Sequence, residues 1–275
     1  MSITSPLICL LCVVAGAVTV GAATRNGDAG AGRDLVALSQ RRVFFGHQSV
    51  GMNLLEGVRE LAVREGVALR IEERTNATGL GPGTLAHGWI AENSDPLRKL
   101  RSFDAALAPG VGPDLALMKF CYVDIGPETD VAALFAAYQA TMGTLRARHP
   151  RTTFVHVTVP LTTVQGGIKA MVKWLLDRPP YGLLENARRE EFNALLRRSY
   201  EGLEPLFDLA QVESTTPTGA AEIASWKDRT VPALVAAYTD DGGHLNQEGR
   251  IRAARALVAV LAAAPTSVVA PSGGR

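Results

Sequence analysis

The stretch RVFFGHQSVGMNLL occupies residues 42–55 and holds the first change from a strand pattern to a helix pattern. Its first four residues are β-prone, and from Leu54 to Ala62 apolar residues recur at helical spacing until Gly66 ends the run. The clearest strand is TFVHVTV, residues 153–159, because it is dense in β-branched residues. A strand that leads straight into an amphipathic helix is typical of a parallel sheet covered by helices.

Strand-like and helix-like segments alternate through the rest of the chain. The expected strands cover residues 42–45, 67–72, 115–120, 153–159 and 206–209. The expected helices cover about residues 54–65, 95–107, 129–148, 184–200 and 246–261. A glycine-rich loop is expected over residues 76–93, and an excursion over the sheet edge follows Pro160. The pattern predicts an α/β fold with one doubly wound domain, residues 36–264, whose mostly parallel five-stranded sheet has helices on both faces, as in flavodoxin-like proteins.

The two ends of the chain differ in composition from this domain. An apolar run from Pro6 to about Val20 leads into Gly21-Ala22-Ala23, which predicts a secretory signal peptide over residues 1–23, with an uncleaved N-terminal anchor as the alternative. Export would make the protein secreted or periplasmic. Residues 265–275 are rich in Ala, Pro, Ser and Gly and are expected to form a disordered tail.

Composition and charge exclude several classes of function. The chain has 275 residues with a formal net charge of +1, and its Lys and Arg are spread out, which argues against nucleic-acid binding. Nothing beyond the N-terminal segment indicates a membrane partner. No segment has metal-ligand spacing, so neither a metal nor another cofactor is predicted; a site built from His47, His87, His244 and Asp241 is the weaker alternative.

Two segments carry residues suited to catalysis. In GHQSVGMN, residues 46–53, Ser49 lies at the carboxyl end of the first strand and at the start of the first helix, where free backbone N–H groups can stabilise an oxyanion. The alternative is that Ser49 is simply a helix N-cap. In DDGGHLNQEG, residues 240–249, Asp241 can accept a hydrogen bond from Nδ1 of His244, leaving Nε2 to take a proton from a nucleophile. The alternative there is a surface turn with an incidental histidine.

Together these segments resemble the serine and Asp-x-x-His blocks of the SGNH/GDSL hydrolase superfamily. The resemblance covers residues 43–258 and includes the run NARREEFNALLRRSYEGLEPLFDLA, residues 186–210. It implies that Ser49 is the nucleophile, that His244 is the general base and that Asp241 orients His244.

The sequence departs from the family pattern around the oxyanion hole. The usual Gly-Asp-Ser is replaced by His-Gln-Ser, which leaves His47 as a residue that could shape the site or bind substrate. Gly88 is the favoured counterpart of the family's oxyanion-hole glycine. The family's Gly-x-Asn is absent where this chain has residues 119–122, so Cys121, Tyr122 or Asn53 is the candidate replacement for the asparagine.

The resemblance implies an extracytoplasmic ester hydrolase that forms an acyl-serine intermediate. Its expected substrate is an acylated carbohydrate or another small ester. Two alternatives stay open: a catalytically weak or inactive member that binds a carbohydrate or a partner, and an O-acyltransferase in which a sugar hydroxyl replaces water. The fold alone cannot choose among these.

Overall fold

The computed structural model of the chain describes residues 21–107 and 112–265. The predicted signal peptide lies outside these residues except for its last three positions, and the predicted tail lies outside them except for Pro265. In the described part of the chain, no helix is long and apolar enough to cross a membrane.

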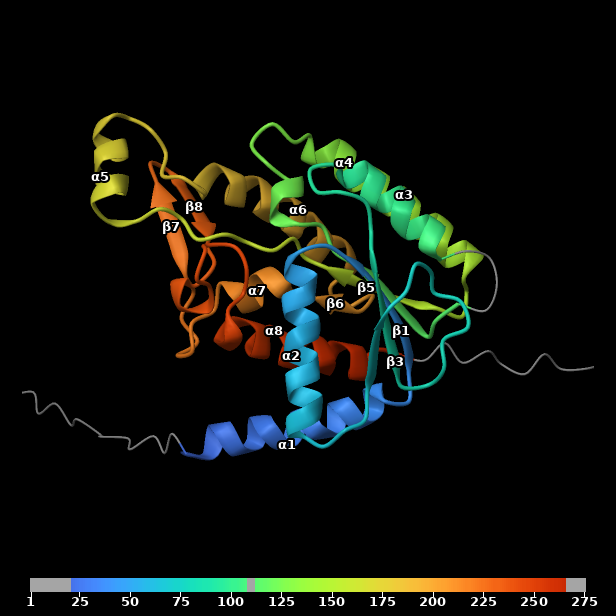
Figure 1. The fold of residues 1–275 in the computed structure, drawn as a ribbon. Helices are drawn as coiled ribbons and strands as arrows, with labels where there is room; N and C mark the ends of the chain where they lie inside the picture. Colours follow the sequence, from blue (N-terminus) through green and yellow to red (C-terminus); the bar gives the residue numbers. More distant parts are fainter. Residues whose placement is uncertain (1–20, 108–111, 266–275) are drawn as a thin grey trace, which may run out of the picture.

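A six-stranded parallel sheet forms the centre of the molecule (Figure 1). Its strand order is β2-β3-β1-β4-β5-β6. The strands are β1 (Arg42–His47), β2 (Arg70–Glu73), β3 (Thr84–Trp89), β4 (Leu115–Met118), β5 (Thr153–Val157) and β6 (Leu206–Phe207). The α/β class and the parallel sheet are confirmed.

The expected count of five strands is wrong, because β3 lies inside the segment predicted to be a glycine-rich loop. Gly88 is part of this strand and pairs with Gly46 of β1. A Cβ atom at Gly88 would lie 2.7 Å from the carbonyl oxygen of Arg74 and 3.2 Å from the ring of Phe44. The glycine is therefore required by the close approach of Arg74 and Phe44 within the sheet, and not by a turn.

Helices cover both faces of the sheet, as the doubly wound prediction requires. The helices are α1 (Gly21–Leu38), α2 (Val50–Arg64), α3 (Pro96–Ala106), α4 (Val131–Arg148), α5 (Gly167–Leu175), α6 (Leu183–Tyr200), α7 (Leu209–Glu213) and α8 (Gln247–Ala263), with short 3-10 turns η1 (Tyr122–Asp124) and η2 (Ala236–Tyr238). Phe45 packs in the cluster that includes α1, α2 and α8, whereas Phe44 packs with α3, α4 and α6 on the other face. Adjacent residues of β1 thus pack into hydrophobic clusters on opposite faces of the sheet.

Two parts of the chain extend the predicted architecture. Ala31 and Leu35 of α1 are buried, so the packed unit begins before the expected residue 36. The long stretch after β6, predicted to be irregular, contains an antiparallel hairpin of β7 (Ile223–Trp226) and β8 (Arg229–Pro232). The hairpin lies near α5 and away from the central sheet (Figure 1).

Buried amides of α6 hold the chain that leaves β5. The side chain of Asn193 accepts a hydrogen bond from the N–H of Val159 (2.7 Å) and donates one to the carbonyl oxygen of Val159 (3.0 Å). Two turns earlier, Asn186 makes the same pair of contacts with Thr162, at 3.1 and 2.7 Å. Because the two asparagines lie on one face of α6, they fix an extended segment along the helix.

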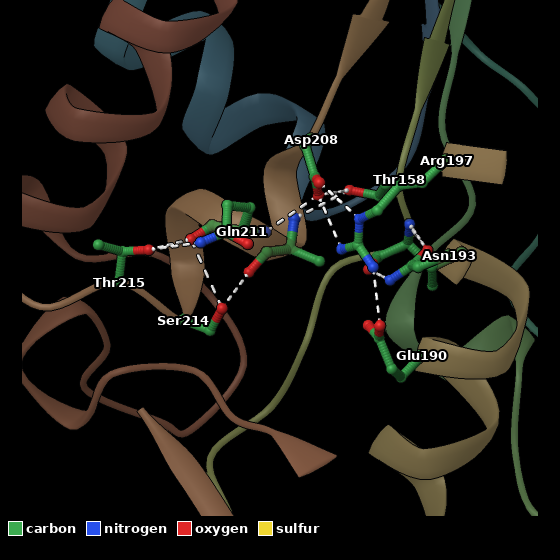
Figure 2. A network of polar contacts seen from close by, with 10 residues as sticks. Thr158, Glu190, Asn193, Arg197, Asp208, Gln211, Ser214 and Thr215 are labelled. Atoms are coloured by element: carbon green, nitrogen blue, oxygen red, sulfur yellow. Dashed lines mark hydrogen bonds and ion pairs between the residues drawn. The ribbon is translucent and has the colours of Figure 1, made fainter. Parts of the chain in front are cut away.

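A polar network anchors the start of this segment (Figure 2). Arg197 of α6 donates to Asp208 (2.6 Å) and to Glu190 (2.7 Å), and Thr158 donates to the same aspartate (3.1 Å). The carboxylate of Asp208 also caps α7 by accepting from the N–H of Gln211. The ends of β5 and β6 are thereby tied to α6 and α7.

A buried carboxyl group lies beneath the same segment. Glu213 accepts a hydrogen bond from the N–H of Leu161 (2.7 Å), and its other carboxyl oxygen has no partner in the described residues. Burial raises the pKa of Glu213 to about 8, although this hydrogen bond and the charges of Lys119 and Arg189 act in the opposite direction. The neutral, protonated form is therefore favoured in the folded protein.

This raised pKa predicts a pH-dependent stability. Since the folded-state pKa of about 8 exceeds the ordinary 4.5, the contribution of Glu213 is full below pH 4.5 and is lost as the pH rises through about 8. We expect the free energy of unfolding, measured by urea denaturation, to fall between about pH 5 and about pH 9 in the wild type. In Glu213→Gln it should fall by a smaller amount over the same pH range. Glu201→Gln, at an exposed position, controls for the removed charge. An equal loss in Glu213→Gln and wild type would show that Glu213 is ionised throughout.

Candidate functional site

Ser49, His244 and Asp241 meet at the carboxyl edge of the sheet. The Oγ atom of Ser49 lies 2.5 Å from Nε2 of His244, although 195 positions separate the two residues. The Nδ1 atom of the same histidine lies 2.6 Å from Oδ2 of Asp241. An ionised carboxylate only accepts hydrogen bonds, so Nδ1 carries the proton and Nε2 accepts from the serine hydroxyl. The three predicted residues thus form one continuous hydrogen-bonded chain.

The turn between η2 and α8 holds Asp241 firmly. Its Oδ1 atom accepts from the N–H groups of Gly243 (2.9 Å) and His244 (2.8 Å). Burial acts to raise the pKa of Asp241, but the hydrogen bonds from the His244 ring and these N–H groups outweigh burial and hold the pKa well below its ordinary value. Gly242 has a φ of +90°, a conformation that glycine adopts at little cost. Asp241 is therefore a fixed anion beside the imidazole.

Ser49 has a strained backbone and does not act as a helix cap. It precedes α2 with a φ of 46°, and its side chain makes no capping hydrogen bond. A non-glycine residue in this region costs about 1–3 kcal/mol, a strain often found at active sites. The hydroxyl is directed to His244 instead. Within the described residues, the N–H of Ser49 makes no hydrogen bond, so it is free to donate to a substrate oxygen.

The loops that follow β3 and β4 flank Ser49, because these strands lie on either side of β1. The side chain of Gln48 donates to the carbonyl oxygen of Ala91 (2.6 Å). Gly88 lies inside β3 and not in the expected loop, and its role as the oxyanion-hole glycine stays a prediction. Ile90 and Ala91 are the residues after β3 that contact the serine block.

A buried ion pair, missed in the sequence, joins these two loops. Lys99 donates to Asp124 (2.6 Å), and both side chains are fully buried. The same carboxylate accepts from the N–H groups of Ser94 (2.7 Å), after β3, and of Cys121 (2.6 Å), after β4. Because a buried carboxylate with several donors is costly to disturb, Asp124 fixes the spacing of the two loops across the end of β1. One feature of the sequence could have indicated this ion pair: Lys99 lies on the apolar face of α3, four residues before the buried Phe103.

The three candidate replacements for the missing asparagine lie in different environments. Asn53 uses its carbonyl oxygen to accept from the N–H of Leu245 (3.2 Å), which fastens α2 to the triad turn. Cys121 is buried, and its sulfur lies 3.5 Å from Nζ of Lys119. Tyr122 is half-buried and presents its ring to His244, with the ring centroids 5.8 Å apart and nearly perpendicular. Tyr122 is thus the candidate whose side chain faces the triad.

His47 lies beneath the site rather than in it. It is fully buried, and its Nε2 lies 3.1 Å from Nδ1 of His87. Burial lowers the pKa of His47 to about 3, and the charge of Lys119 acts in the same direction, so the ring is neutral. In the described residues no three His, Cys, Asp or Glu side chains converge as metal ligands: His47 pairs with His87, and His244 with Asp241.

A polar pocket of about 430 Å³ lies next to the triad turn. It is lined in part by Tyr122, Thr163, Glu185, Arg189 and Asp241. A larger hollow of about 890 Å³ lies between α2, α7 and α8, and none of the three triad residues lines it.

Arg189, which sequence reasoning also missed, forms the wall of the smaller pocket. The guanidinium is buried and donates to the carbonyl oxygen of Tyr122 (2.8 Å) and to the side chains of Thr162 (2.9 Å) and Asn186 (2.6 Å). Burial lowers the pKa of Arg189 to about 10, which leaves it charged at neutral pH. The pocket therefore combines a cation, carboxylates and hydroxyls, a lining suited to a polar group.

Comparisons with known proteins bear on the fold. No protein-family profile and no curated protein match the chain. Among solved structures, it is similar to the periplasmic domain of a lipopolysaccharide acetyltransferase from Salmonella ser. Paratyphi A, with 14% identity over 86% of each chain and a TM-score of 0.41. It is also similar to a protein from Desulfitobacterium hafniense assigned to the G-D-S-L family of lipolytic proteins, with 9% identity over 80% of this chain and 99% of that chain and a TM-score of 0.43. A mutant acetyl esterase with an acetate ion shows 12% identity over 77% and 90% of the two chains and a TM-score of 0.42. At these identities the likeness concerns the α/β fold alone.

Proposed function

We propose that this protein is a serine ester hydrolase that forms an acyl-Ser49 intermediate. The observation that carries the proposal is the unbroken hydrogen-bonded chain from Ser49 through His244 to Asp241. A serine hydroxyl alone is a weak nucleophile at neutral pH, and an adjacent oriented base activates it. The apolar segment over residues 6–20 supports an extracytoplasmic location.

The geometry supports the following sequence of proton transfers. As Ser49 Oγ attacks the acyl carbon, its proton passes to Nε2 of His244, and Asp241 stabilises the imidazolium that forms. The same proton then goes to the departing alcohol, which leaves an ester on Ser49. A water molecule that gives its proton to Nε2 next attacks this ester, and Ser49 regains its proton as the acid leaves. The free N–H of Ser49, at the start of α2, supports the oxyanion in both steps.

The exposure of the triad favours water as the acyl acceptor over a sugar hydroxyl. The side chains of Asp241 and His244 are 56% and 42% exposed, so bulk water reaches the base. The neighbouring pocket, with its carboxylates, arginine and hydroxyls, suits a hydroxyl-rich alcohol such as a carbohydrate. We therefore propose acylated carbohydrates or other small polar esters as substrates.

Product partitioning tests the acyl-serine step. Purified protein is given acetyl esters of two phenols in water containing methanol, and acetate and methyl acetate are measured. A shared acetyl-Ser49 intermediate predicts one product ratio for both esters, because the phenol has left before the acceptor attacks. A ratio that changes with the phenol would contradict a shared intermediate. Turnover no faster than that of Ser49→Ala on a wide panel of esters would favour a binding protein.

A further inference from the structure

Helix α5 turns its apolar side to the solvent. It stands apart from the other helices, near the β7–β8 hairpin (Figure 1), and none of its residues is buried. Ile168, Met171, Val172 and Leu175 follow the i, i+3, i+4, i+7 spacing of one helix face, and Ile168 and Leu175 are 77% and 70% exposed. In a soluble protein such a stripe normally packs on the core. Here nothing in the described chain covers it.

The exposed apolar residues are concentrated in this region. Half of the large apolar side chains exposed in the described residues lie within residues 168–181. We define the α5 surface as Ile168, Met171, Val172, Trp174, Leu175 and Leu176. Since contiguous exposed apolar surface of this kind marks interaction sites, the α5 surface needs a partner.

Positive charges lie beside the α5 surface. Lys169 and Lys173 lie on the helix itself, and Arg178 follows it. The sole acidic residue in the sequence from 167 to 182, Asp177, is already paired with Lys227 at 2.7 Å. Lys227 also lies over the ring of Trp226 in the hairpin, 4.5 Å from its centroid. The partner should therefore be apolar inside and negatively charged at its surface.

We propose that the α5 surface binds the face of an anionic lipid bilayer. A short amphipathic helix lies in the plane of such a surface, with its apolar side in the headgroup region and its lysines against the phosphates. The sequence predicts no membrane contact outside the N-terminal segment, and it predicts residues 167–175 only as part of an excursion over the sheet edge.

The α5 surface is connected directly to the pocket beside the triad. The two ends of the α5 excursion are joined by a hydrogen bond from the N–H of Gln165 to the carbonyl oxygen of Tyr181 (2.9 Å). Just before it, the N–H of Thr163 donates to the carbonyl oxygen of Gly242 in the triad turn (2.9 Å). Gln165, Tyr181 and Gly242 all line the pocket. Lipid binding would thus hold the pocket close to the bilayer surface.

Vesicle flotation tests the proposal without any ester, so its outcome is independent of the proposed function. Residues 24–275, which lack the apolar N-terminal run and keep all packed residues from Ala31 onward, are mixed with vesicles. We expect binding to vesicles of phosphatidylglycerol and phosphatidylcholine, and at least about tenfold weaker binding to phosphatidylcholine alone. Ser49→Ala should bind like the wild type.

Two variants of α5 locate the binding surface. Ile168→Ser with Leu175→Ser should weaken binding to the mixed vesicles at least about tenfold, because two apolar side chains no longer enter the bilayer. Lys169→Glu with Lys173→Glu keeps the apolar stripe and the helix propensity and should weaken binding by a similar factor. The matched control, Val63→Ser with Leu203→Ser, removes apolar side chains that are 78% and 80% exposed elsewhere and should leave binding unchanged.

Three results would overturn the proposal. The first is no binding of the wild type to the anionic vesicles, and the second is equal binding by the wild type and both α5 variants. The third is a wild-type dimer in solution that the Ile168→Ser, Leu175→Ser variant converts to a monomer, which would show that a second copy of the chain covers α5.

Discussion

Replacing Ser49 with alanine is expected to lower kcat for ester hydrolysis by on the order of a million-fold, since the loss of a triad nucleophile has an effect of this size in a well-studied serine protease. The alanine removes the hydroxyl that lies 2.5 Å from Nε2 of His244 and leaves no atom to carry the acyl group. The measurement is kcat for hydrolysis of one ester substrate, with protein freed of contaminating esterases. Ser225→Ala, at an exposed position of β7, serves as the matched control and should retain full activity.

A Ser49→Ala protein that is folded and hydrolyses the ester within about tenfold of the wild-type rate would show that the acyl group is not carried by Ser49. The strained backbone at this position adds a second readout. Glycine adopts a φ of 46° more easily than serine, so Ser49→Gly should be no less stable than Ser49→Ala in urea denaturation while being equally inactive.

Replacing Asp241 with asparagine is expected to lower kcat by about 10,000-fold while the fold stays intact. The amide oxygen can still accept from the N–H groups of Gly243 and His244, so the turn is kept. The amide nitrogen would face Nδ1 of His244 and donate to it, which moves the ring proton to Nε2. A protonated Nε2 cannot take the proton of Ser49. The neighbouring Asp240→Asn removes the same charge without touching the imidazole and should have little effect.

The comparison of Asp241→Asn with Asp240→Asn separates orientation of the histidine from a general effect of charge. Equal small losses in both variants would mean that Asp241 does not control the tautomer of His244. Equal large losses would point to the charge of the turn as a whole. We expect the kcat values of the two variants to differ by about three orders of magnitude or more.

The triad could be found in the sequence because each member lies in a short segment beside an element boundary. Ser49 follows a strand, and Asp241 and His244 precede the Asn246 cap of the last helix. Parallel sheets bring the carboxyl ends of their strands to one edge, so segments at opposite ends of the chain can meet there. Local pattern alone leaves a helix cap and a surface turn as alternatives, and it is the resemblance to the SGNH/GDSL blocks, together with this topological rule, that predicts the meeting of these residues.

Other features could not be predicted because they depend on partners distant in the sequence. The run TLAHGW of β3 has the small residues and glycine of a loop, and only pairing with β1 and β2 makes it a strand. Lys99 finds Asp124, and Asn186 and Asn193 find the chain after β5, only in the folded protein. Likewise the sequence predicts the segment of α5 only as an excursion over the sheet edge, and it predicts neither the helix nor the outward direction of its apolar face.

The most direct test of the triad is covalent labelling of the folded protein with a fluorophosphonate, read by intact mass and by peptide mapping. We expect one phosphonyl group to add to wild-type protein on the peptide that contains Ser49, because His244 activates this hydroxyl. Ser49→Ala should remain unlabelled and Asp241→Asn should react far more slowly. Folded wild-type protein that resists the probe, or that is labelled equally after Ser49→Ala, would contradict Ser49 as the activated nucleophile.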